Sequence, residues 1–132
     1  MSIEANKQII RNLVEEVYNG RHIEAIPNYF IAGSFLAGSA ANLIRGMSAS
    51  FPDFQMTIED LIAEGDKVVN HMTMRGTHLG EFFGHPPTGK PVLAGGISIY
   101  TIRDGKIVTM ASENNILILY QQLGITPVIE QE

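Results

Sequence analysis

The sequence predicts an α+β fold in which one strongly curved β-sheet covers its apolar face with helices from the first part of the chain. Apolar residues recur at helical spacing up to Phe51, and runs rich in β-branched residues replace them after Pro52. The strands are joined by turns and one Gly/Pro-rich loop rather than alternating with helices, which is typical of an α+β domain and not of a parallel sheet. A curved sheet closed by helices encloses a pocket, where small ligands usually bind.

The first helix is expected over residues 2–18. Ser2 is a suitable residue to cap its start and Gly20 to cap its end. The apolar residues that share one face at helical spacing are Ile9, Ile10, Leu13, Val14 and Val17. We therefore expect an amphipathic helix that lies on a larger surface.

Two further helices are expected before the sheet. Residues 22–30 predict a short helix whose regularity is limited by Pro27, and residues 40–51 predict a third helix that ends before Pro52. The small, apolar stretch 31–39 between them is compatible with a short strand or a loop.

Four strands are expected after Pro52. They span residues 54–64, 67–78, 92–102 and 106–115, and a short apolar segment follows over 116–123. In the strand over 67–78, one face carries Val68, Asn70, Met72, Met74 and His78. The opposite face carries Val69, His71, Thr73, Arg75 and Thr77.

Length and composition indicate one globular domain over residues 1–132, with a frayed tail over 126–132. The net charge of −5 and nine scattered Lys/Arg residues argue against nucleic-acid binding. The chain contains no cysteine, which excludes thiol nucleophiles, disulfides and thiolate metal sites. With no apolar run long enough for a bilayer and no signal-peptide pattern, we expect a soluble cytoplasmic protein that does not bind membranes.

Several segments between Phe51 and Gly124 carry a family resemblance. They are 51–54 (FPDF), 58–68 (IEDLIAEGDKV), 75–82 (RGTHLGEF), 86–92 (PPTGKPV), 104–107 (DGKI) and 121–124 (QQLG). In this order and at this spacing they resemble the SnoaL-like polyketide cyclases of the nuclear-transport-factor-2-like superfamily. The resemblance implies a cone-shaped α+β barrel, also called cystatin-like, with a curved mixed sheet. It further implies a homodimer, a deep apolar cavity and catalysis without metal or organic cofactor.

The sequence departs from the family where the chemistry is expected. Members carry a stretch similar to His-Trp-x-x-x-Asp on the final strand, and the Asp is their usual acid or base. These three positions are Met110, Ala111 and Asn115 here. Members also often carry a His after the second helix, where this chain has Phe35 and Leu36.

Three polar residues are candidates for catalysis. Asn115 cannot act as a general base, but it can donate a hydrogen bond to a developing enolate, or it can simply cap the segment that follows. Glu113 is a replacement for the missing carboxylate if its strand face points into the cavity, and a solvated surface residue if it does not. His78 is an acid or base at the pocket mouth, or its ring fixes the loop over residues 80–91.

Candidate ligand contacts come from flexible and aromatic side chains. Met72, Met74 and Met110 are expected either to line a pliable cavity or to pack in the core. Tyr29 and Tyr100 offer hydroxyls, and Phe35 stands near a position that bears His in the family. The four histidines show no metal-binding spacing, so we expect neither a metal nor an organic cofactor.

The leading function predicted is a cofactor-independent cyclase or isomerase that acts on a hydrophobic, polyketide- or terpenoid-like small molecule. Asn115 would polarise an oxygen, with Glu113 or His78 as the titrating partner. The alternative is a binding protein that has kept the cone and lost the chemistry, because the family His, Trp and Asp are all replaced.

Overall fold

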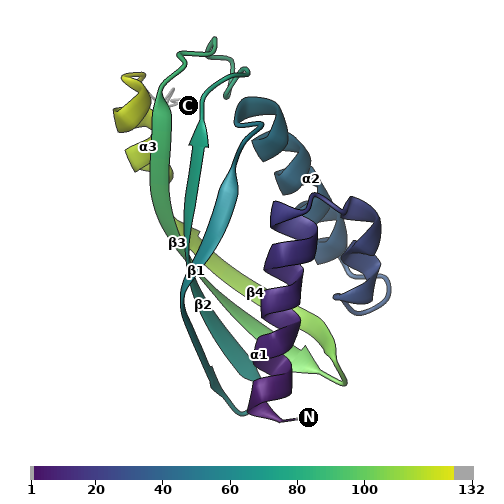
Figure 1. Ribbon diagram of the computed structural model, residues 1–132. Coiled ribbons are helices and arrows are strands. Elements are labelled where there is room, and N and C mark those ends of the chain that lie inside the picture. Colours follow the sequence, from purple (N-terminus) through teal and green to yellow (C-terminus); the bar gives the residue numbers. More distant parts are fainter. Residues whose placement is uncertain (1, 127–132) are drawn as a thin grey trace, which may run out of the picture.

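The computed structural model describes residues 2–126, and it has the α+β architecture predicted (Figure 1). Helical segments precede a four-stranded sheet, and one helix follows it. The elements are α1 (Ile3–Asn12), η1 (Leu13–Asn19), η2 (Ile23–Asn28), α2 (Phe35–Ser50), β1 (Gln55–Glu64), β2 (Lys67–Thr77), β3 (Pro91–Arg103), β4 (Lys106–Asn114) and α3 (Ile116–Leu123). The frayed tail expected over 126–132 falls, apart from Thr126, outside the described residues.

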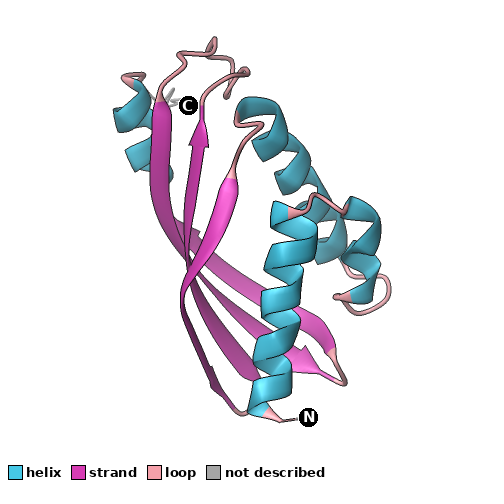
Figure 2. Cartoon of the chain, viewed as in Figure 1, coloured by secondary structure: helices cyan, strands magenta, loops and turns pink. Residues whose placement is uncertain are grey.

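The sheet is one twisted, curved layer with strand order β1-β2-β3-β4 (Figure 2). All three neighbouring strand pairs are antiparallel. The parallel component of the expected mixed sheet is an isolated bridge between Phe30 and Ile107. Helices α1 and α2 lie along one side of this layer, and α3 lies beside one end of β3 (Figure 1).

Alternation along the strands separates an inner from an outer sheet face. On β2, Val68, Asn70 and Met74 are buried, as predicted for that face. On β1, a bulge at Glu59 adds one residue, so that the inward positions change from even to odd numbers along the strand. The bulge keeps apolar residues facing the helices on both sides of the irregularity.

The helical layer begins as expected and then departs from regular α-helix. The Ser2 hydroxyl oxygen accepts a hydrogen bond from the Ala5 N–H (3.1 Å), α1 widens into the π-helical segment η1, and Gly20 caps its end. The expected helix over 22–30 is the short 3₁₀ segment η2. No helix within residues 2–126 is both long and apolar enough to cross a bilayer.

Helix α2 begins earlier than expected. We predicted a strand or loop over 31–39, but the helix starts at Phe35, because the Ser34 hydroxyl oxygen accepts a hydrogen bond from the Leu36 N–H (3.2 Å). The expectation is therefore wrong from Phe35 onwards. A capping serine decides the boundary in a stretch whose small residues show little periodicity.

Buried apolar side chains form two clusters. The larger lies between the helices and the sheet and includes Ile10, Leu13, Val17, Ile44, Val68, Tyr100 and Ile107. The smaller lies toward α3 and includes Phe51, Phe54, Met74, Phe82, Val92, Leu119 and Leu123. Met56 packs against both clusters and marks the place where they meet.

Two polar side chains fasten the helical layer to the start of the sheet. The Asn19 amide donates to the Met56 carbonyl (2.9 Å) and accepts from the Met56 N–H (2.7 Å). The Arg21 guanidinium donates to the carbonyls of Pro52 (3.0 Å) and Phe54 (2.8 Å) and lies 4.0 Å from the centre of the Phe54 ring. Together they fix where β1 begins.

Asn19→Leu is expected to lower the free energy of unfolding by about 2 kcal/mol, because it removes two hydrogen bonds and leaves a backbone donor and acceptor of Met56 unpaired. Urea denaturation measures the loss. The matched control is Asn12→Leu on the exposed helix surface, where we expect a change within about 0.5 kcal/mol. Equal unfolding free energies for the two variants would contradict the role assigned to Asn19.

Candidate functional site

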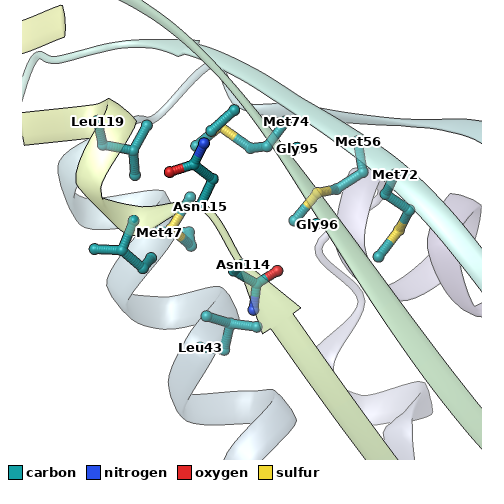
Figure 3. A pocket seen from close by; sticks show the side chains of 12 residues that line it. Leu43, Met47, Met56, Met72, Met74, Gly95, Gly96, Asn114, Asn115 and Leu119 are labelled. Carbon is teal, nitrogen blue, oxygen red and sulfur yellow. The ribbon is translucent and has the colours of Figure 1, made fainter. Parts of the chain in front are cut away.

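A cavity of about 100 Å³ opens where the two core clusters meet (Figure 3). Its walls are mainly apolar and come from Leu43, Met47, Met56, Met72, Met74, Ala94, Ile116 and Leu119, together with the backbone of Gly95 and Gly96. Its polar side chains are Asn114 and Asn115. Helix α2, the inner face of the sheet and the start of α3 thus converge on a pocket with flexible thioether walls.

Asn115 has the capping role considered for it and also lies at the cavity. Its side-chain oxygen accepts a hydrogen bond from the Ile118 N–H (3.2 Å) at the start of α3, and its backbone N–H donates to the Gly95 carbonyl (3.0 Å). The amide nitrogen points toward Met74 (Figure 3). The cap uses the oxygen of this amide and leaves its two N–H donors for the cavity.

Asn114 is a lining residue that the sequence did not indicate. Its amide oxygen takes the space that a Cβ atom at Gly96 would need, and its nitrogen points toward Leu43 (Figure 3). The alternation of faces along β4 could have indicated that Asn114 points inward. Ser112 faces inward, where its hydroxyl hydrogen-bonds that of Ser98 (Oγ–Oγ 2.7 Å), and Asn114 is two residues further on the same face. Both amides at the cavity therefore present donors.

Glu113 lies on the opposite side of the sheet. It is exposed and pairs with Ile97, which is itself exposed on the outer face. The expectation that Glu113 shares a face with Asn115 is corrected, because β4 ends at Asn114 and Asn115 adopts the backbone of a helix cap (φ −82°, ψ 73°). The two-residue period of a strand does not continue across this end.

His78 is completely buried and fastens the loop that follows β2. Its Nδ1 accepts a hydrogen bond from the Thr88 N–H (3.1 Å), and its ring centre lies 5.7 Å from that of Phe51 and 6.2 Å from that of Phe82. Because Nδ1 is the acceptor, this hydrogen bond assigns the proton of the neutral ring to Nε2. His78 does not line the cavity, and the loop-fixing alternative is confirmed.

The other expected ligand contacts are divided between the cavity and the rest of the fold. Met72 and Met74 line the cavity, whereas Met110 packs against the larger cluster and Tyr100 is buried within it. Burial raises the pKa of the Tyr100 hydroxyl.

Two expected ligand contacts lie outside the cavity. The Tyr29 hydroxyl donates to the Glu16 carboxylate (2.6 Å), and desolvation together with that carboxylate raises the pKa of Tyr29 to about 12. Phe35 is 80% exposed, since it stands at the start of α2 rather than in a loop over the pocket.

The cavity is electrostatically neutral. Among the described residues, none that lines it has a side chain that titrates. In the same part of the chain, residues 2–126, no three His, Asp or Glu side chains come together as a metal site. What the cavity offers to a ligand is apolar contact and amide hydrogen-bond donors.

Gly96→Ala is expected to displace the Asn114 amide, because the new methyl group would occupy the position of its oxygen. The side-chain amide resonances of Asn114 in a ¹H–¹⁵N NMR spectrum should shift strongly. Gly95→Ala is the matched control, since the nearest atom to a Cβ there is 3.8 Å away. If both variants leave these resonances unchanged, the packing of Asn114 over Gly96 is wrong.

Comparison with known proteins agrees with the resemblance seen in the sequence. Residues 8–123 match the family model of the SnoaL-like polyketide cyclases. TsrD from Streptomyces laurentii is 27% identical with a TM-score of 0.82, over 96% of this chain and 99% of its own. No curated protein sequence matches the chain.

Two further solved structures are similar. AclR from Streptomyces galilaeus, provisionally assigned as a hydroxylase, is 26% identical with a TM-score of 0.84, over 98% of this chain and 91% of its own. IdmH from Streptomyces antibioticus, provisionally assigned as a polyketide cyclase, is 26% identical with a TM-score of 0.79, over 91% and 99%. From the family match over most of its length, the chain belongs to the SnoaL-like polyketide cyclase family.

Proposed function

We propose that the chain, one domain over residues 1–132, is a cofactor-independent cyclase or isomerase of a hydrophobic, polyketide- or terpenoid-like small molecule. The observation that carries the proposal is an apolar cavity whose two polar side chains, Asn114 and Asn115, both direct amide N–H groups inward. Family membership and the assignment of the similar protein IdmH support it.

The amides suit a reaction in which negative charge develops on a carbonyl oxygen. In an intramolecular aldol closure, a carbon next to one carbonyl loses its proton to water and attacks a second carbonyl carbon. A C–C bond forms, and the resulting alkoxide takes a proton from water, so that the net reaction is an isomerisation. Hydrogen-bond donors aimed at the enolate oxygen lower the barrier to the first step.

The helix cap prepares Asn115 for this role. Its side-chain oxygen is held by the Ile118 N–H, which fixes the plane of the amide and therefore the direction of its N–H groups. A donor that is already oriented needs no reorganisation when charge develops. An amide has no useful pKa, so water rather than Asn115 must carry the proton.

A binding protein without turnover is the second candidate. It is favoured by the absence of a titratable side chain among the described lining residues, since Glu113 is outside the cavity and His78 is committed to the loop. A binder would hold the same ligand by the same contacts and release it unaltered. The two candidates differ in what is recovered after incubation.

Asn115→Ser separates the chemistry from the cap, because serine caps helices well but places no amide in the cavity. Using an aryl 1,5-diketone that closes to its isomer, a 3-hydroxycyclohexanone, we expect Asn115→Ser to lower the rate by about 10²-fold while keeping stability. Asn115→Ala should lose about 1 kcal/mol of stability as well. Asn115→Asp keeps the cap and restores the carboxylate of the family pattern.

The outcome distinguishes the two candidates. A rate unchanged in Asn115→Ser would contradict the role of the amide. Binding of the diketone by the native protein with no acceleration over buffer, and recovery of the diketone intact, would favour the binding protein. Turnover that appears only in Asn115→Asp would show that the native chain lacks the catalytic group.

We also propose that the chain forms a homodimer through the outer face of the sheet. That face carries a cross-strand apolar row of Ile62, Val69, Ile99 and Ala111, one from each strand. Leu93, Ile97 and Ile99 on β3 are 49%, 48% and 41% exposed, although β3 is a central strand. Apolar surface gathered on one face in this way is typical of a protein interface.

Ile99→Lys is expected to convert the dimer to a monomer, because it places a charge at the centre of the proposed interface. Ile31→Lys is the matched control, since Ile31 is 49% exposed but lies in the loop before α2. Size-exclusion chromatography with light scattering gives the molar mass of each. A native protein with the mass of one chain would refute the dimer.

A further inference from the structure

Three polar side chains form a row across the inner face of the sheet beside the cavity, and two of them, Asn70 and Ser98, are buried whereas Ser112 on the edge strand is exposed. Asn70, Ser98 and Ser112 are paired neighbours on β2, β3 and β4. Two residues further along each strand, the same face belongs to the cavity wall, at Met72, Gly96 and Asn114. Because two strand residues span roughly 7 Å, the buried Asn70 lies about that far along β2 from the cavity wall at Met72.

Asn70 is the unusual member of this row. It is fully buried, and neither its amide oxygen nor its amide nitrogen has a hydrogen-bond partner among the described residues. The hydroxyls of Ser98 and Ser112 bond each other, and the Tyr100 hydroxyl lies beside Ser98 and Asn70 without completing the bonds of the amide.

Leaving a whole amide unpaired in a core is costly, and more than nine in ten buried polar groups are paired. By contrast, Asn19 uses both atoms of its amide to hold the Met56 backbone. The Asn70 side chain is therefore available to a polar group that does not belong to the chain.

Asn70 lies next to the cavity wall along the sheet. Met72 is two residues from it on β2, and the wall position paired with Met72 is Gly96, over which lie the amide of Asn114 and the backbone carbonyl of Glu113. An unbranched methionine changes its conformation easily. Ligand pockets usually have ~300–1000 Å³, so a ligand of ordinary size needs more room than the cavity of about 100 Å³ provides.

We infer that the cavity extends inward past Met72 and that the Asn70 amide binds a hydroxyl or keto group at the buried end of the ligand. This inference rests on the proposed function, because it assumes that the cavity is the ligand site. The opposite end of the ligand meets Asn114 and Asn115. The ligand class is then an elongated, ring-containing molecule with an oxygen at each end, the two separated by at least roughly 7 Å, the length of a fused two-ring system.

The test uses two probes of equal shape, 2-naphthol and 2-methylnaphthalene, and measures their dissociation constants by fluorescence titration. An apolar pocket alone prefers the methyl group, because the hydroxyl is better hydrated in water. We expect the native protein to bind 2-naphthol at least as tightly as 2-methylnaphthalene. In Asn70→Leu, the ratio of the two constants should move about tenfold toward 2-methylnaphthalene.

Asn12→Leu, which makes the same replacement on the exposed helix surface, should keep the native ratio. A second measurement needs no variant. In ¹H–¹⁵N spectra of the native protein, 2-naphthol should shift the side-chain amide resonances of Asn70 more than 2-methylnaphthalene does.

The outcomes separate the two proposals. If both probes bind, and their ratio is the same in the native protein and in Asn70→Leu, the inference about Asn70 is overturned while the ligand cavity stands. If neither probe binds the native protein, both are overturned. Loss of the naphthol preference in Asn70→Leu supports the inference whatever the rate of Asn115→Ser, since binding and turnover are measured separately.

Discussion

The attachment of the helices to the first strand is the constraint on which the rest of the molecule depends. Asn19 holds the Met56 backbone in the manner of a neighbouring strand, and Arg21 gathers the carbonyls that lead into β1. Met56 packs against both core clusters and forms part of the cavity wall. The contacts of Asn19 and Arg21 therefore set the distance between the helical layer and the sheet, and with it the width of the cavity.

The closing helix α3 is positioned by a comparable device at the other end of the sheet. The Gln122 side chain donates to the Leu93 carbonyl and accepts from the Leu93 N–H (2.8 Å each), so it continues the hydrogen bonding of β3 where β4 has ended. This contact holds α3 beside β3, and Asn115 at its start is consequently fixed at the cavity. At each end of the pocket, a side-chain amide makes the pair of backbone hydrogen bonds that a neighbouring strand would make: Asn19 with Met56 at one end, and Gln122 with Leu93 at the other.

The features of the fold that follow from local periodicity were predictable from the sequence, and those that depend on single hydrogen bonds were not. Alternation correctly placed Val68, Asn70 and Met74 on the inner face of β2. The bulge at Glu59 and the early start of α2 at Phe35, which the Ser34 cap sets, have no periodic signal, because each depends on one residue. The position of the cavity likewise has no periodic signal in the sequence.

The sequence left open whether Met72, Met74 and Met110 line a cavity or pack in the core; Met72 and Met74 line the cavity, and Met110 packs against the larger cluster. The side of the sheet on which Glu113 lies depends on where β4 ends, which the sequence does not mark. The His78 ring is held by a hydrogen bond from Thr88, ten residues away across a loop without regular structure, and the sequence does not indicate this contact.

The cap at Asn115 has a consequence for how such a site evolves. Asn and Asp cap helices about equally well, so an exchange between them at this position leaves the fold nearly unaffected. The chemistry of the cavity changes completely, from a neutral donor to a base. Selection on stability therefore acts only weakly on this exchange, so that an amide donor and a carboxylate can replace each other at the cavity in one step without an unstable intermediate.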